Sequence, residues 1–149
     1  MKHTKLIKRK AHDYGLPFGL VAAIVEVESD FNTFAVRYET DWKYFVRPFS
    51  DFHWHEKTEE QSQKFSYGLM QVIGSVAREL GFEGRFLTEL CDPEIGLEYG
   101  CKHLKRYYDR YKDYSKAIVA YNGGPGAVAS YDGSYRNQDY LEKVLKKWK

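Results

Sequence analysis

One segment of this sequence has to be surrounded by the rest of the chain. After Pro17, apolar residues follow one another at three- and four-residue spacings from Leu20 to Val27, a pattern typical of a helix. Because these residues leave the helix little polar surface, we expect it to be buried on almost all sides. The segment therefore predicts a fold in which other elements pack around one apolar helix.

Further segments are also typical of helices. Asp92-Pro93-Glu94 combines a capping residue, a proline suited to the first helical position and an acid in the first turn, which predicts a helix that runs to about Tyr111. Shorter helices are predicted over residues 2–10, 75–80 with Ser75 as N-cap, 116–121 with Ser115 as N-cap, and 137–148. We predict a single, mainly α domain over residues 1–149.

The stretch from Asp30 to Ser66 is different, since it has no helical period. Aromatic residues are scattered through it among charges, and aromatics make up 17% of the whole chain, with 13 tyrosines. A long irregular stretch in a compact domain is usually functional or disordered, and this aromatic content argues against disorder. Tyrosine-rich surfaces suit sugars, because the ring offers flat apolar area and the hydroxyl a polar group. We predict an ordered insertion that lines a cleft and has room for a short hairpin.

Charge, hydropathy and cysteine content exclude several classes of protein. A formal net charge of +2 gives no support to nucleic-acid binding. No window approaches the roughly 18 to 20 apolar residues of a membrane span, and the basic start leads into no apolar signal-peptide core. We expect a monomer that is made in the cytoplasm. If a helix starts at Pro93, Cys101 lies eight residues along it, a rise of roughly 12 Å, so we expect no disulfide between Cys101 and Cys91.

Glu28 is out of place for a charged residue. It lies one helical turn from Ile24 and Val25 and two turns from Val21, on the apolar face of the predicted buried helix. Burial disfavours the ionised form of a carboxylic acid, so its pKa rises and it can donate a proton near neutral pH. Two interpretations stay open: Glu28 is a general acid, or it is an inert, hydrogen-bonded residue at the rim of the core.

Four short motifs occur in order along the chain. They are Glu28-Ser29 followed by Asn32, Gly68-Leu69-Met70-Gln71, Ala120-Tyr121-Asn122-Gly123-Gly124, and Tyr140 followed by Val144. Each motif alone is weak, but the four in order resemble the catalytic domain of soluble lytic transglycosylases, a family related to goose-type lysozymes. The resemblance runs from about Leu16 to Val144. It implies a lysozyme-like helical fold and an enzyme, without a cofactor, that acts on the glycan strands of peptidoglycan.

The resemblance also assigns roles around the bond to be cleaved. It makes Glu28 the acid that protonates the glycosidic oxygen between N-acetylmuramic acid and N-acetylglucosamine. Ser29 would orient Glu28 or the muramoyl substituents. The sugar-binding residues implied are Met70 and Gln71 at the borders of the subsites, Tyr121 and Asn122 on the cleft floor with Tyr121 hydrogen-bonding near Glu28, and Tyr140 beside them. Taken singly, Met70 and Tyr140 are also typical of a core, and Asn122-Gly123 of a turn.

The mechanism divides where the sequence departs from the family pattern. In lytic transglycosylases one carboxylic acid protonates the leaving oxygen and then acts as base, so that the muramoyl 6-hydroxyl closes a 1,6-anhydro ring. Lysozymes use water, often activated by a second carboxylate. Here Arg37, Glu39 and Asp41 stand in the stretch where goose-type lysozymes keep that second acid. Glu39 or Asp41 could activate water, or Glu39 could pair with Arg37 or a substrate amide.

We predict the anhydro product, with goose-type hydrolysis as the alternative. An aromatic-rich insertion helps to exclude water, and an intramolecular hydroxyl held nearby has a large effective concentration. A catalytically silent wall-binding or assembly module is the alternative from another class, although it would have no need of an acid at Glu28. A wall enzyme without a signal peptide favours a phage endolysin or virion-associated enzyme over a secreted enzyme given without its signal.

His53 and His55 are the histidine pair of this sequence that suggests a metal site. Alternate histidines can both face one ion from an extended strand, but no third ligand with suitable spacing accompanies them. We therefore predict a solvated aromatic loop at this position and no metal.

Overall fold

The computed structural model describes residues 1–149, and it is mainly α. The helices are α1 (Thr4–Asp13), α2 (Phe18–Ser29), α3 (Glu56–Ser62), α4 (Gly74–Glu79), α5 (Pro93–Tyr111), α6 (Tyr114–Ala129) and α7 (Gln138–Lys147). The strands are β1 (Val36–Tyr38), β2 (Phe65–Tyr67) and β3 (Val72–Ile73), and two 3₁₀ turns are η1 (Phe49–Asp51) and η2 (Leu87–Cys91). The prediction of a mainly α fold is confirmed.

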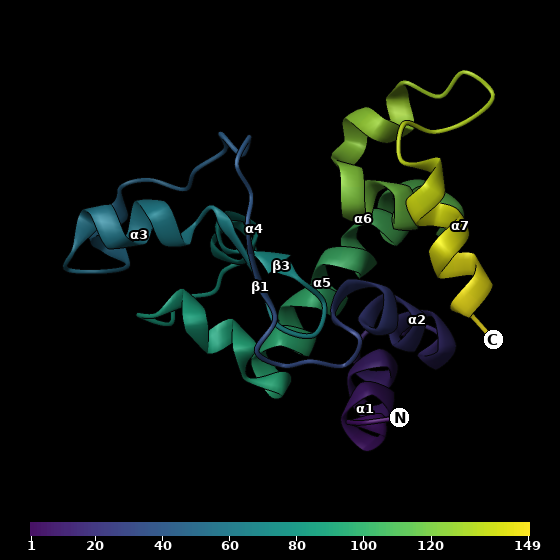
Figure 1. Cartoon of the computed structure of the whole chain (residues 1–149), viewed down its shortest axis with the longest axis horizontal. Coiled ribbons are helices and arrows are strands. Elements are labelled where there is room, and N and C mark those ends of the chain that lie inside the picture. The colour runs from purple at the N-terminus through teal and green to yellow at the C-terminus, as the bar shows by residue number, and fades with distance from the viewer.

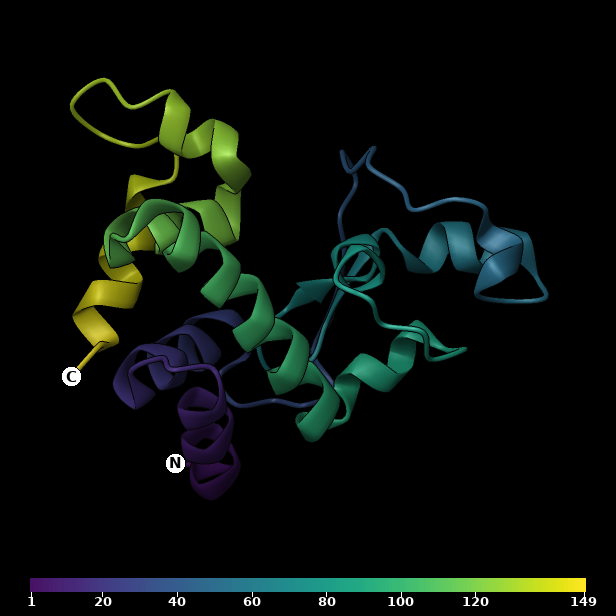
Figure 2. The ribbon, with the colours of Figure 1, turned by 180° about the vertical axis from the view of Figure 1, so that it is seen from behind.

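The elements form two lobes joined by α5. The sheet lobe (residues 36–91) holds the strands with α3 and α4, and the helical lobe holds α1, α2, α6 and α7 (Figure 1). From behind, α5 runs between the two lobes (Figure 2). None of the helices combines the length and the apolar character that a membrane crossing requires.

The apolar helix predicted after Pro17 is α2, and it is buried as expected. Leu20, Val21 and Ile24 are 0% exposed, and α2 packs against both α1 and α7. Burial changes in the last turn, where the residues from Glu26 to Ser29 are only partly buried. The end of α2 therefore carries its side chains out of the core to the boundary between the lobes.

The predicted aromatic insertion is ordered and contains more regular structure than the sequence indicates. It supplies β1, which pairs antiparallel with β2 in the register Val36 to Tyr67, and β2 in turn pairs with β3. It also supplies α3, whose first turn is capped by the His55 ring, which accepts the Thr58 N–H at 3.2 Å. The seven residues of α3 are almost all polar, so no periodic spacing of apolar residues predicts this helix.

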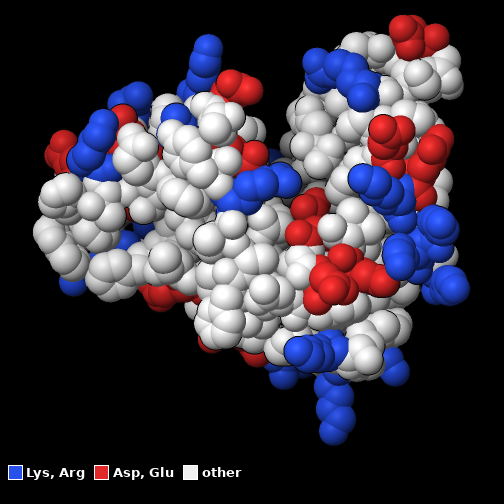
Figure 3. All heavy atoms as spheres, in the orientation of Figure 1, with Lys and Arg blue, Asp and Glu red and all other residues white.

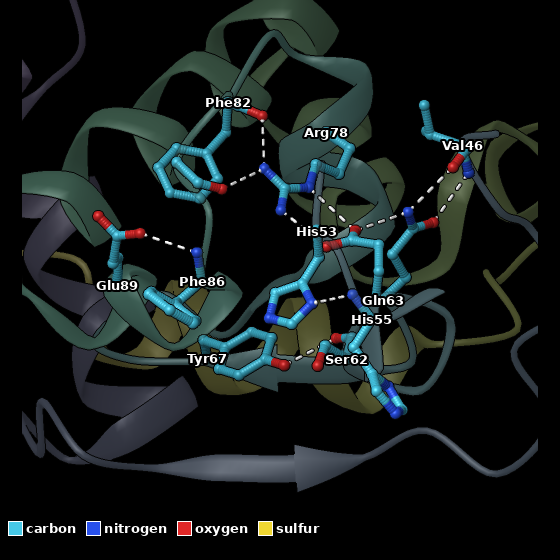
Figure 4. A network of polar contacts seen from close by, with 12 residues as sticks. Val46, His53, His55, Ser62, Gln63, Tyr67, Arg78, Phe82, Phe86 and Glu89 are labelled. Carbon is cyan, nitrogen blue, oxygen red and sulfur yellow. Dashed lines mark hydrogen bonds and ion pairs between the residues drawn. The ribbon is translucent and has the colours of Figure 1, made fainter. Parts of the chain in front are cut away.

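A buried ion pair fastens α3 to α4 (Figure 4). The Arg78 guanidinium donates to both carboxylate oxygens of Glu59, at 2.8 and 3.0 Å, and their side chains are 0% and 1% exposed. Gln63 adds a hydrogen bond to Glu59 at 2.8 Å and reaches the Val46 backbone, and Arg78 also donates to the Phe82 carbonyl at 3.0 Å. Every charge in this network has partners, as buried charges require.

Two predicted helix caps are wrong. Ser75 lies inside α4, whose N-cap is Ile73, because the Ser75 hydroxyl instead accepts the Trp42 indole N–H at 2.7 Å. Asp113, two residues before the predicted Ser115, caps α6. The predicted stop at the glycine-rich segment is a kink at Gly124 (φ 73°), beyond which the helix continues to Ala129.

The predicted start of the long helix at Asp92 is confirmed. Asp92 caps α5 by accepting the N–H groups of Glu94 and Ile95. Cys91 and Cys101 are free thiols.

Candidate active site

Glu28 lies where α2 leaves the core, and its carboxyl faces the boundary between the lobes. Burial raises its pKa from 4.5 to about 7, an effect that the Tyr140 hydroxyl and the Arg37 charge oppose and Glu39 reinforces. The Tyr140 hydroxyl donates to Oε1 of Glu28 at 2.7 Å, and no cation lies within 4.0 Å of this carboxyl. Glu28 therefore carries a proton in a large share of molecules near neutral pH.

A cleft between the lobes has Glu28 in its wall. The central cavity has a volume of about 160 Å³, with Glu28 and Tyr121 on the helical side and Glu39, Ser66 and Gln71 on the side of the sheet lobe. In the space-filling view a hollow separates the lobes, with acidic atoms at its lower end and basic atoms on its flanks (Figure 3).

Glu39 lies directly after β1, in the same cavity as Glu28. Its Oε1 accepts the Arg37 Nε–H at 2.9 Å and the Ser66 hydroxyl at 2.6 Å, and its side chain is 24% exposed. The pairing with Arg37 that the sequence left open is present. Asp41 is exposed in the turn that follows and does not line this cavity.

The segment Gly68–Gln71 forms the turn between β2 and β3. Gly68 has φ +73°, and a Cβ there would lie 2.5 Å from the Leu90 carbonyl oxygen, so only glycine fits. Gln71 also has a positive φ of 49°, and its amide N–H groups donate to the carbonyls of Ala35 and Gly68 at 2.9 and 3.0 Å. Gln71 thereby fixes the turn while its side chain lines the cavity.

Met70 lies in the core, whereas Tyr121 lines the same cavity as Glu28. The Met70 side chain is 0% exposed and packs against Gly100, so it does not reach the cleft at which the sequence predicts a contact with sugar. The Tyr121 hydroxyl donates to the Met70 carbonyl at 2.6 Å, and it is Tyr140 that hydrogen-bonds to Glu28. The motif residues lie near Glu28, but the side chains of neighbouring residues in a tight turn point alternately into the cavity and into the core.

Ser29 and Asn122 complete the residues that the motifs place here. The Ser29 hydroxyl donates to the carbonyls of Val25 and Leu69, at 3.1 and 2.8 Å, and so ties the end of α2 to the β2–β3 turn rather than to Glu28. Asn122 is exposed on α6, lines the cavity and accepts a hydrogen bond from the Asn137 amide at 2.9 Å.

Trp42 and His103 also line the cavity without belonging to the four motifs; Trp42 comes from the aromatic insertion that we predicted to line a cleft, whereas His103 was not predicted. Burial, helped by the charge of Arg106, lowers the pKa of His103 to about 3, so its ring is neutral. Its ring packs on Tyr121, with centroids 4.8 Å apart. His103 lies three residues after Gly100 and four before Tyr107 on the buried face of α5, a spacing that could have revealed it.

The His53 and His55 rings serve the backbone. The predicted solvated loop holds for Trp54 and His55, which are exposed, but His53 is only 7% exposed, and its Nδ1 accepts the His55 N–H at 2.9 Å. Nδ1 of His55 caps α3. The structure contains no group of three or more His, Cys, Asp or Glu side chains placed to share an ion.

Known proteins resemble this chain over nearly its whole length. The sequence profile of the transglycosylase SLT domain matches residues 5–144. The membrane-bound lytic murein transglycosylase C of Pectobacterium atrosepticum is 27% identical over 92% of this chain and 35% of that protein. The transglycosylase of Enterobacteria phage PRD1 is 32% identical over 53% of this chain and 27% of that protein.

Solved structures show the same fold. The lytic transglycosylase Slt of Pseudomonas aeruginosa, solved as the inactive E503Q mutant, superposes with a TM-score of 0.62 at 21% identity over 97% of this chain. The 70-kDa soluble lytic transglycosylase of Escherichia coli gives 0.60 at 20% identity. This chain spans about a third of the first relative's length and about a fifth of these two structures. The resemblance found in the four motifs is confirmed, and the chain belongs to the transglycosylase SLT domain family.

Proposed function

We propose that this chain cleaves the β-1,4 bond between N-acetylmuramic acid and N-acetylglucosamine in peptidoglycan, with formation of a 1,6-anhydromuramoyl end. The observation that carries the proposal is Glu28, a buried carboxyl whose pKa is raised to about 7 in the wall of a cleft. Membership of the SLT family supports the substrate and the reaction.

Glu28 serves twice in this reaction. Its proton passes to the glycosidic oxygen as the bond to the muramoyl C1 breaks. The resulting carboxylate then takes the proton of the muramoyl 6-hydroxyl, whose oxygen bonds to C1, so that Glu28 ends protonated and no water is consumed. A pKa near 7 suits both steps, because neither form of the carboxyl is then strongly disfavoured.

The other residues position the substrate and the acid. Tyr140 holds one oxygen of Glu28 through its hydroxyl. Gln71 and Asn122 line the cavity and offer their amide groups to the sugars at the bond, and Tyr121 lines it with its ring, because its hydroxyl is bonded to the Met70 carbonyl. Ser29 contributes indirectly, because its hydrogen bond to the Leu69 carbonyl fixes the turn that carries Gln71.

Hydrolysis is the second candidate reaction, and Glu39 favours it. Its carboxylate lines the same cavity as Glu28 and is held by Arg37 and Ser66. A carboxylate placed across the bond from the acid could activate water, as in inverting glycosidases. If it does so, Glu39→Gln should lose most activity while still binding glycan. If Glu39 only positions substrate, the same change should mainly raise KM.

Mass spectrometry of the products from purified sacculi tests both reactions. We expect muropeptides with anhydro ends, and their loss in Glu28→Gln. Products with mainly reducing muramic ends would move the chain to the hydrolytic side. Failure of the wild-type chain to release any muropeptide would favour a catalytically silent wall-binding module.

The setting of the activity is part of the same proposal. We place the chain's action at the bacterial cell wall, as a monomer and in a phage endolysin or virion-associated enzyme. The similarity to the phage PRD1 transglycosylase supports the phage setting, whereas the membrane-bound relatives support a bacterial wall enzyme. Light scattering of the purified chain tests the monomer, and a mass corresponding to a dimer would contradict it.

A further inference from the structure

The cleft continues past Glu28 into a second cavity on the side of the helical lobe. This cavity has a volume of about 400 Å³ and shares Glu28, Arg37 and Asn122 with the central one. Arg136, just before α7, and Lys143 within α7 also line it. A group attached to a sugar held at Glu28 can therefore reach these side chains.

The second cavity carries cations that no side chain neutralises. Arg136 and Lys143 are both exposed, and neither has an acidic partner within 4.0 Å. Asp139 is the only carboxylate besides Glu28 in the lining, and it forms no ion pair. Arg37 is already paired with Glu39. Arg136 and Lys143 thus remain available to an anion from outside the chain.

Asn137 lies in the same lining, directly before α7. Its amide donates to the Val119 carbonyl at 3.0 Å and to Asn122 Oδ1 at 2.9 Å, and its own Oδ1 is buried without a hydrogen-bond partner. These two hydrogen bonds fasten the start of α7 to α6 and so hold the segment that carries Arg136 at the wall of the cavity.

We propose that the second cavity binds a carboxylate carried by the muramoyl residue, with Arg136 and Lys143 as its cationic partners. This inference rests on the proposed function. The sugar rings of peptidoglycan are uncharged, and the carboxylates near the bond belong either to the lactyl group or to the peptide stem attached to it. The cavity therefore selects strands whose muramoyl residues bear free carboxylates.

The test compares each glycan substrate with its neutralised form. Stem-bearing, uncross-linked strands and amidase-stripped strands, which keep only the lactyl carboxylate, are each used untreated and after amidation of their carboxylates with methylamine. The quantity measured is the ratio of kcat/KM for untreated over amidated strands, so that partial unfolding of a variant cancels. We expect a ratio of about three to ten for two exposed cations, decreasing at high salt. The substrate that shows the ratio identifies the source of the carboxylate.

Variants locate the effect. In the double variant Arg136→Gln/Lys143→Gln the ratio should fall toward one, whereas Lys116→Gln, the same loss of charge at an exposed position of α6 outside the cleft, should keep the wild-type ratio. Affinities of the same strands for inactive Glu28→Gln should show the same preference without turnover. A wild-type ratio of one, or an unchanged ratio in the double variant, would overturn the carboxylate site alone. Absence of cleavage of every substrate would overturn the proposed function and this site with it.

Discussion

Two carboxyl groups, one buried in the sheet lobe and one partly buried at the edge of the helical lobe, have opposite surroundings. In the sheet lobe, Glu59 is 1% exposed and receives two hydrogen bonds from Arg78 and one from Gln63. In the helical lobe, Glu28 receives one hydrogen bond, from the neutral Tyr140 hydroxyl, and no cation contacts it. Burial raises the pKa of Glu28 to about 7.

The difference shows that burial alone does not turn a carboxyl group into a proton donor. Glu59 is desolvated as fully as Glu28, but a bidentate guanidinium compensates its charge and fixes it as a structural group. Glu28 is left without that compensation at a cleft, so its proton is available to a ligand.

The largest effect is expected from Glu28→Gln. The amide keeps the shape and removes the proton, so the rate of muropeptide release should fall at least about a hundredfold. At pH 7 the variant should be more stable than the wild type, by up to roughly 3 kcal/mol, because a neutral amide is less costly to bury than the charge that the wild-type carboxyl acquires. Activity within a fewfold of wild type would show that Glu28 is not the acid.

The same substitution in the other lobe should have the opposite outcome. Glu59→Gln leaves the Arg78 guanidinium buried without a counter-ion, which should lower the free energy of unfolding by about 3–5 kcal/mol. The double variant Glu59→Leu/Arg78→Met removes both charges and should recover most of this loss. Denaturant unfolding measures the free energy of unfolding of both variants. If Glu59→Gln lowered it by less than about 1 kcal/mol, water would already be solvating the charges of the pair.

The raised pKa of Glu28 also makes stability depend on pH. Because its pKa is 4.5 when unfolded and about 7 when folded, its contribution to stability is fully present below about pH 4.5 and is lost as pH rises through 7. The wild-type chain should therefore lose roughly 3 kcal/mol relative to Glu28→Gln between pH 4.5 and 8. Unfolding of both chains at several pH values measures the difference, and parallel curves would rule out the raised pKa.

The helical lobe could be predicted from sequence more fully than the sheet lobe, for a physical reason. The spacing of apolar residues in α2 predicts that the helix is buried, and the same spacing places Glu28 on an apolar face. The α3 segment is polar, and its ion pair joins Glu59 to a residue 19 positions away, so neither local period nor propensity reveals it. Pairing between distant charges becomes visible only when the chain is folded.

Within the site, motif order predicted which segments meet but not which way each side chain points. Met70 turns into the core while its neighbour Gln71, at positive φ, lines the cavity. The Ser75 hydroxyl accepts a hydrogen bond from Trp42, which lies in the irregular insertion. The sequence near Ser75 contains no sign of this distant partner, so it indicated only a helix cap. Side-chain direction in a tight turn depends on backbone angles that spacing does not determine.

The smallest effect is expected from removing one hydroxyl. Tyr140→Phe abolishes the hydrogen bond to Glu28, which favours the ionised form and opposes the rise in the pKa. The pKa of Glu28 should therefore rise further, and the alkaline limb of the kcat/KM profile should move up by about one pH unit. The rate at the optimum should fall by less than about tenfold, because the proton donor itself is retained.

Tyr67→Phe is the matched change in the sheet lobe. The Tyr67 hydroxyl donates to the Ser62 carbonyl at 2.7 Å within the network of Figure 4 and does not touch Glu28. This variant should lose about 1 kcal/mol of stability, as expected for a buried hydrogen bond, and keep the wild-type pH profile. If Tyr140→Phe also kept that profile while losing only stability, Tyr140 would be a packing residue like Tyr67. A shift in the profile confined to Tyr140→Phe instead assigns Tyr140 to positioning the acid, and ties the pH range of the reaction to one contact between α2 and α7.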